Sequence, residues 1–145
     1  MKWIDLPPVW LIGAMALMWA LAGAAPWPGA PAIWVGRAII LAAIALMVWT
    51  AISFRRRRTT IVPHMEPDAL VTDGPMRFSR NPIYAADVAI LIGWGVSLGA
   101  ALPFLIVPAF AVVIQRRFIL AEEARLEAAF GAAFRDYKTR VGRWI

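Results

Sequence analysis

Four long apolar runs constrain this chain more than any other feature. Each run contains at most two charged residues. They cover residues 9–25, 33–54, 84–102 and 103–121. A helix needs roughly 20 such residues to cross about 30 Å of hydrocarbon, and Gly99 and Pro103 leave only a tight turn between the last two runs. The sequence therefore predicts an all-α polytopic membrane protein with four transmembrane helices, the last two forming a helical hairpin.

The composition excludes several classes of protein. Of the 145 residues, 61% are hydrophobic, which rules out a disordered chain, and the length fits one domain, residues 1–145. There is no cysteine and a single histidine, His64, so the sequence predicts no disulfide, thiol nucleophile or metal site. The net charge of +6 in so apolar a chain favours membrane lipids with anionic headgroups, and not nucleic acid, as partners.

The basic residues predict the orientation in the membrane. Arg55 to Arg58 end the second run and Arg116 and Arg117 lie late in the fourth, whereas residues 26–32 carry no charge. The positive-inside rule then places both termini in the cytoplasm of an integral membrane protein, predicted for a bacterial inner membrane. The stretch AGAA at 22–25 resembles a signal-peptide cleavage site, but the n-region is only weakly positive, which favours a retained span.

A polar strip, LVTDGPMRFSRNPIYAAD at 70–87, separates the second and third runs. It contains two turn signals, TDGP and RNP. Asn81 suits a helix N-cap and Pro82 suits the first helical position, so RNPIY is predicted to open the third helix. A helix N-terminus can bind a carboxylate or phosphate, although capping alone also explains these residues.

Three carboxylates near the predicted membrane boundary are candidate functional groups. Asp87 lies one turn inside a span, where an acidic residue is costly unless it is paired or faces a wet cavity. Glu122 and Glu123 follow the fourth run, and they are either a solvated pair or a site for a cationic ligand group. Together with nearby arginines they predict a site for a ligand of mixed charge.

The tail from Glu122 is predicted to be one C-terminal amphipathic cytoplasmic helix. One face is apolar, with Leu126, Phe130, Phe134, Tyr137 and Val141 at helical spacing. The other face is basic, with Arg135, Lys138, Arg140 and Arg143. Such a helix lies on the membrane surface or covers a pocket, and the periodicity does not separate the two.

Two motifs in the last 85 or so residues resemble a known family. LVTDGPMRFSRNPIY, followed by a hairpin and then EEARLEAAFGAAFRDYKTRVGRWI, is similar to the isoprenylcysteine carboxyl methyltransferase and phospholipid methyltransferase group of integral membrane enzymes. The resemblance implies S-adenosylmethionine as the methyl donor, bound at the cytoplasmic ends of the last spans. Residues 55–145 would then be the cofactor-binding core, and residues 1–54 two additional spans.

The resemblance also implies site residues. The cofactor-binding positions would be Asp68, Leu70, Val71, Asn81, Pro82, Tyr84, Glu122 and Glu123. Arg116 or Arg117 falls near a substrate-contacting, catalytic arginine. Two positions depart from the family pattern: Asn81 replaces a histidine and Met76 replaces an aromatic residue. GWG at 93–95 resembles a phospholipid-branch motif, but we read its glycines first as helix-packing positions.

The methyl acceptor is left open by the sequence. A lipidic or small hydrophobic carboxylate is slightly favoured, because it needs only an arginine to orient it. An amine or hydroxyl acceptor would need a base, for which the candidates are His64, Asp87 and Glu123. Two other functions are considered: an NADPH-dependent sterol or isoprenoid reductase, since RNPIYAAD resembles an element of those enzymes, and a non-catalytic membrane scaffold.

Overall fold

The computed structural model describes residues 6–23, 32–57 and 69–145. Within these ranges the secondary structure is helical and includes no strand. The residues form two compact units. The first unit is drawn from Met1–Ile44 and Ala86–Ile114, and the second from Ala45–Ala85 and Gln115–Ile145. Asp68, a predicted cofactor-binding residue, and His64, one of the candidate bases, lie outside the described ranges.

The first two helices agree with the predicted spans. Helix α1 is Pro7–Ala22, and it begins at a Pro-Pro pair, which suits the first helical turn because proline has no N–H to leave unsatisfied. Helix α2 is Ala32–Arg56, and two arginines lie in its last turn. The predicted run at 33–54 therefore lies within a helix, and the run at 9–25 is helical as far as Ala22.

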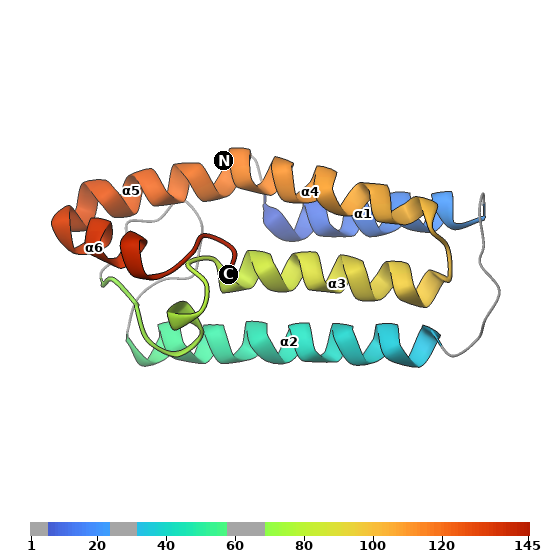
Figure 1. Cartoon of the computed structure of the whole chain (residues 1–145), viewed down its shortest axis with the longest axis horizontal. Coiled ribbons are helices and arrows are strands. Elements are labelled where there is room, and N and C mark those ends of the chain that lie inside the picture. The colour runs from blue at the N-terminus through green and yellow to red at the C-terminus, as the bar shows by residue number, and fades with distance from the viewer. Residues whose placement is uncertain (1–5, 24–31, 58–68) are drawn as a thin grey trace. The chain divides into compact units, whose positions relative to one another are not determined.

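The predicted hairpin is confirmed, but its boundaries differ from those expected. Helix α3 is Pro82–Leu98, so it ends four residues before the predicted Leu102. Gly99 has a φ of 62°, a conformation that stops the helix and suits only glycine well. A short 3₁₀ segment, η2 (Leu102–Leu105), then leads into α4 (Ile106–Ile114). Figure 1 shows α3 and α4 running in opposite directions on either side of this turn.

Small residues allow close helix packing in the first unit. A Cβ atom on Gly93 of α3 would lie 2.7 Å from the Gly36 carbonyl oxygen of α2, and one on Gly95 would lie 3.1 Å from the Met18 side chain of α1. Between these glycines, the Trp94 indole donates a hydrogen bond to the Met15 carbonyl at 3.1 Å. The GWG glycines are thus packing positions, as predicted.

Apolar side chains also cover the outside of the helices. Trp19, Trp34 and Leu41 are each about two-thirds exposed, which in a water-soluble protein would leave much apolar surface in contact with water. Two described helical stretches, Ile33–Arg56 and Leu102–Phe130, are long and apolar enough to cross a membrane. Helices α1 and α3 are apolar but shorter, with 16 and 17 residues. These features agree with a membrane protein, and four spans remain a prediction.

The fourth helix is longer than predicted. After α4, the helix continues through a π-helical segment, η3 (Gln115–Ile119), into α5 (Leu120–Phe130). The prediction that it ends near Ala121, and that a separate tail helix begins at Glu122, is wrong. The helical path breaks only at Gly131, whose φ of 51° and ψ of −118° are available only to glycine. Helix α6 (Ala132–Arg140) follows, so the tail is two helices rather than one.

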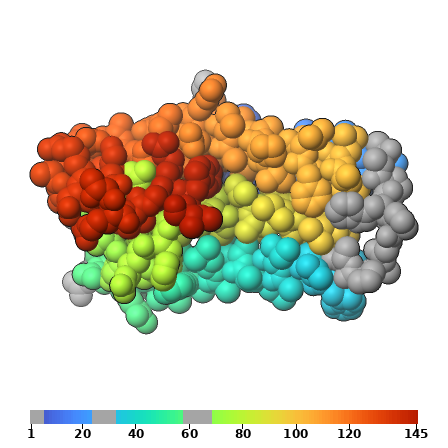
Figure 2. Space-filling model, in the orientation of Figure 1, coloured from blue at the N-terminus to red at the C-terminus, as the bar shows by residue number. Residues whose placement is uncertain are grey.

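The core of the second unit joins this tail to the polar strip. Val71 and Met76, beside and within the short 3₁₀ segment η1 (Gly74–Arg77), pack with Phe134 and Tyr137 of α6. Figure 2 shows the red C-terminal residues against the yellow-green surface of this strip. Other members of the predicted apolar stripe pack on the same cluster, namely Leu126, Phe130 and Val141. The stripe is therefore confirmed as one apolar surface, although two helices carry it.

Candidate functional site

The two sequence motifs meet at a hydrogen bond between Tyr84 and Glu122. The Tyr84 hydroxyl donates to Glu122 Oε2 at 3.1 Å, across 38 residues of sequence. Tyr84 lies in the first turn of α3 and is 6% exposed, and Glu122 lies in the first turn of α5. This hydrogen bond thus connects the start of α3, which carries the first motif, to α5, which carries the second.

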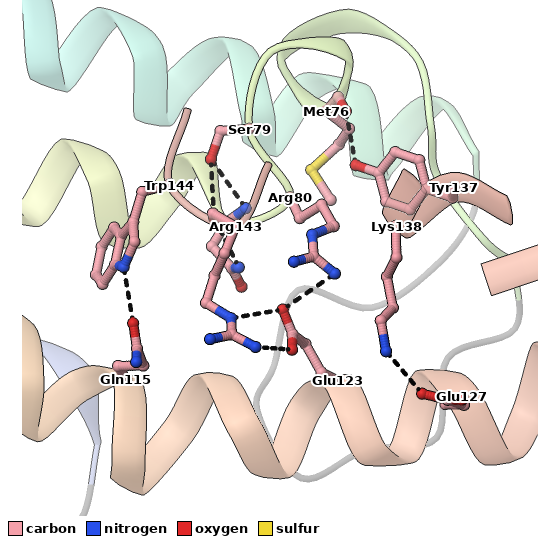
Figure 3. Close-up of polar contacts among 11 residues, drawn as sticks. Met76, Ser79, Arg80, Gln115, Glu123, Glu127, Tyr137, Lys138, Arg143 and Trp144 are labelled. Atoms are coloured by element: carbon pink, nitrogen blue, oxygen red, sulfur yellow. Dashed lines mark hydrogen bonds and ion pairs between the residues drawn. The ribbon is translucent and has the colours of Figure 1, made fainter. Parts of the chain in front are cut away.

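Glu123, the next residue, is held by two arginines (Figure 3). Arg143 Nε donates to Glu123 Oε1 at 3.0 Å, and Arg143 Nη2 donates to Oε2 at 2.7 Å. Arg80 Nη1 lies 3.4 Å from Oε1. Donation of these hydrogen bonds to Glu123 raises the pKa of Arg143 above its ordinary value. The predicted attraction of this glutamate for a cationic group is therefore met here by the chain's own guanidinium groups.

The last residues of the chain lie across the R-N-P element, and we call residues 142–144 the C-terminal strap. The Arg80 amide donates to the Gly142 carbonyl at 2.9 Å. The Asn81 side-chain amide donates to the Arg143 carbonyl at 3.0 Å, and the Ser79 hydroxyl reaches the same oxygen at 3.4 Å. Asn81, where the resembled pattern has histidine, thus uses its side chain to hold the strap.

The far end of the strap is also fixed. The Trp144 indole donates to Gln115 Oε1 at 2.9 Å, at the start of the π-helical segment (Figure 3). Since π-helical turns replace the regular hydrogen-bond pattern and recur at functional sites, this segment is a second irregular element of the site. It carries Arg116 and Arg117, the predicted catalytic residues, whose side chains are exposed.

Buried apolar residues lie behind the polar contacts. Val71 and Met76 are 4% and 7% exposed, and Leu70 packs against the same cluster. The Tyr137 hydroxyl donates to the Met76 carbonyl at 2.6 Å, and burial raises the pKa of Tyr137 to about 12. The predicted loop residues Leu70 and Val71 therefore form an apolar wall together with the residue that replaces the expected aromatic.

The predicted site residues are divided between the two units of the structure. Asn81, Pro82, Tyr84, Glu122 and Glu123 all lie in the second unit, with the apolar loop. Asp87 is 4% exposed on the part of α3 that belongs to the first unit.

Sequence reasoning missed Ser79, Arg80, Gln115 and Trp144, and it misplaced Arg143. Arg143 was assigned to the basic outer face of a tail helix, but α6 ends at Arg140 and Val141 is extended. The strap then turns Arg143 onto Glu123. Gly142 is the one available signal in the sequence, because glycine often follows directly after the end of a helical pattern.

The Phospholipid methyltransferase family matches residues 31–133 of the chain. The chain belongs to the phospholipid methyltransferase family. The matched segment includes Tyr84, Glu122 and Glu123, and it ends before the strap. A Haemophilus influenzae protein described as "Uncharacterized protein" is 40% identical over 63 residues, which are 43% of this chain and 100% of that protein. No solved structure matches the chain significantly.

Membership of the phospholipid methyltransferase family agrees with the resemblance found in the motifs. It supports a methyltransferase of the membrane, in agreement with the two apolar helices that are long enough to span one. The family match also favours methyl transfer over the hydride transfer of a reductase.

Proposed function

We propose that this phospholipid methyltransferase family member transfers a methyl group from S-adenosylmethionine to a membrane lipid or a small amphiphile. The observation that carries the proposal is the Tyr84–Glu122 hydrogen bond at 3.1 Å. It joins the R-N-P-I-Y and E-E motifs, which the family resemblance assigns to one cofactor site. The acceptor enters from the bilayer, and a carboxylate of the isoprenylcysteine type remains one candidate.

The residues of the second unit fit the proposed cofactor chemically. Glu122 supplies a carboxylate for its ammonium group or ribose hydroxyls, while Leu70 and Val71 supply apolar surface for its adenine. When bound, the cofactor supplies a methyl group on a sulfonium, which an acceptor takes by in-line displacement. A carboxylate beside an apolar wall therefore matches the polar groups and the adenine of this cofactor.

The chain's own groups have three tasks in this proposal. Tyr84 fixes the direction of the Glu122 carboxylate through its hydroxyl, and the wall of Val71 and Met76 keeps water away. Arg116 or Arg117, exposed on the π-helical segment, orients an anionic part of the acceptor. The proposed topology has four spans with both termini in the cytoplasm, so the site faces the cytoplasmic side.

Calorimetric titration of S-adenosylmethionine into the full chain in detergent tests this proposal. We expect micromolar-range binding, about tenfold weaker or more in Glu122→Gln and several-fold weaker in Tyr84→Phe, because each change removes a charge-assisted hydrogen bond. Glu127→Gln is the matched control, since Glu127 lies on the same helix and pairs with Lys138 at 3.0 Å. A folded, lipid-supplemented protein that binds no cofactor would contradict the proposal.

A non-catalytic membrane scaffold is the second candidate. The observation that favours it is the pairing of Glu123 with Arg143, which already satisfies the carboxylate that a cofactor would need. Transfer of radiolabelled methyl groups from S-adenosylmethionine into a bacterial lipid extract decides between the two. Label in the lipid fraction, lost in Glu122→Gln, excludes the scaffold.

A further inference from the structure

Arg80 has buried donors without acceptors. Its Nε and Nη1 atoms are buried, and neither has a hydrogen-bond partner among the residues that the structure describes. The side chain as a whole is 10% exposed. An unsatisfied buried donor destabilises the native state, and it does so more strongly when it belongs to a charged group. Native proteins keep few such groups, and those that remain often await a ligand or solvent molecule.

The local charge is also unbalanced. Glu123 gives both of its oxygens to Arg143, at 3.0 and 2.7 Å, and Arg80 stands farther away at 3.4 Å. Two guanidinium groups therefore share one carboxylate. In Figure 3, Arg80 extends from the loop toward Glu123 on α5. The neighbouring hydroxyl, that of Tyr137, already donates to the Met76 carbonyl. The single negative charge of Glu123 therefore faces two positive charges, and its shorter contacts go to Arg143.

The start of α3 adds to the positive potential. Arg80 stands two residues before Pro82, the first residue of this 17-residue helix. The N-terminal end of a helix carries a partial positive charge and favours anions. The helix end and the unsatisfied guanidinium therefore both attract an anion to the same short stretch of chain.

We propose that Arg80 is the binding residue for an oxyanion, a carboxylate or phosphate whose oxygens accept hydrogen bonds from its buried donors. Guanidinium groups match the planar geometry of these anions and bind them through charge-assisted hydrogen bonds. Two sources supply this chemistry: the carboxylate on the methionine part of the cofactor, and the phosphate of a phospholipid. The first source rests on the proposed function, and the second does not.

The test compares probes that differ only in the oxyanion. The full chain in detergent is titrated with S-adenosylhomocysteine and with its analogue lacking the carboxylate. A second arm uses dihexanoylphosphatidate and dihexanoylglycerol, which lacks only the phosphate. Each titration is repeated with Arg80→Gln, with Arg80→Lys, and with the control Arg135→Gln, whose guanidinium is exposed and 3.8 Å from Glu127. Circular dichroism and gel filtration establish that each variant is folded.

The expected result is a loss that depends on the oxyanion. In Arg80→Gln, one of the two oxyanion-bearing probes binds about 10- to 100-fold more weakly, and its oxyanion-free partner binds as in wild type. Arg80→Lys keeps the charge but not the planar donors, so it loses less, and it decides the matter if Arg80→Gln does not fold. The probe that loses affinity identifies the source.

Two outcomes overturn the inference. One is an equal loss for the probes with and without the oxyanion, which would make Arg80 purely structural. The other is a change no larger than that of Arg135→Gln. If wild type binds no S-adenosylhomocysteine, the proposed cofactor fails, and the phospholipid arm still decides whether Arg80 binds an oxyanion.

Discussion

Arg143 donates two hydrogen bonds to Glu123, 3.0 and 2.7 Å long, which connect the third residue from the C-terminus to the start of α5. The Glu123 side chain is 10% exposed and that of Arg143 is 32% exposed. Only a few residues away, Arg140 pairs with Asp136 at 2.7 Å, but both of those side chains are about two-thirds exposed. Two ion pairs of equal length thus lie in very different surroundings.

Arg143→Ala should therefore destabilise the protein far more than Arg140→Ala. The first change leaves a buried carboxylate with Arg80 alone, so we expect the free energy of unfolding to fall by about 1–3 kcal/mol. The second removes a surface pair worth less than about 1 kcal/mol. Thermal and denaturant unfolding in detergent measures both. Equal effects would show that the strap is not anchored by Glu123.

Gly131→Ala should lower stability although no atom obstructs the new methyl group. Nothing lies within 4 Å of a Cβ at this position, so the cost comes from the backbone, whose φ is 51°. We expect a loss of about 1–2 kcal/mol in the free energy of unfolding. Gly13→Ala is the control, since Gly13 is also unobstructed but lies inside α1, where alanine is the better helix former by about 0.5–1 kcal/mol. A stabilising effect at both positions would argue against the break between α5 and α6.

The buried hydroxyl of Tyr137 should make the protein less stable at high pH. Burial raises its pKa to about 12, whereas an unfolded tyrosine titrates near 10. Between these values the unfolded state has lost the phenolic proton and the native state has kept it, so raising the pH favours unfolding. This contribution is complete below about pH 10 and disappears toward pH 12.

The comparison with Tyr137→Phe isolates that effect. The variant loses the hydrogen bond to the Met76 carbonyl, which should cost about 1–2 kcal/mol at neutral pH. The difference between wild type and variant should then shrink as the pH rises above 10. Unfolding curves at several pH values measure it, and a difference that stays constant with pH would contradict the buried hydroxyl.

The proposed orientation in the membrane can be tested by labelling single introduced cysteines, because the natural chain has none. A cysteine at Ala133, an exposed position of α6, should react with a membrane-impermeant maleimide in inverted vesicles and not in intact spheroplasts. A cysteine at Gly29, within the uncharged sequence 26–32, should show the opposite pattern. Labelling of both positions from the same side would exclude the predicted topology.

The sequence by itself determined the chain's membrane character and the positions of most helices. Long apolar runs leave few alternatives, because a lipid environment requires backbone polar groups to be satisfied within each helix. The turn residues Asn81 and Pro82 correctly marked the start of α3, and the apolar stripe correctly grouped Phe130, Phe134 and Tyr137. The motif spacing also led to the right family.

Tertiary structure decided the rest, and the reason lies in contacts between residues far apart in sequence. The helical spacing of the apolar residues continues through Gly131 and gives no sign that a helix ends there. In the structure the positive φ of Gly131 divides the tail into two helices. Gly142 signals at most the end of a helix, and only the structure shows that Arg143 pairs with Glu123. Arg80 belongs to a turn signal in the sequence, and only its burial in the structure reveals donors without acceptors. Local patterns fix backbone preference and polarity, whereas burial and pairing depend on which distant segment packs alongside.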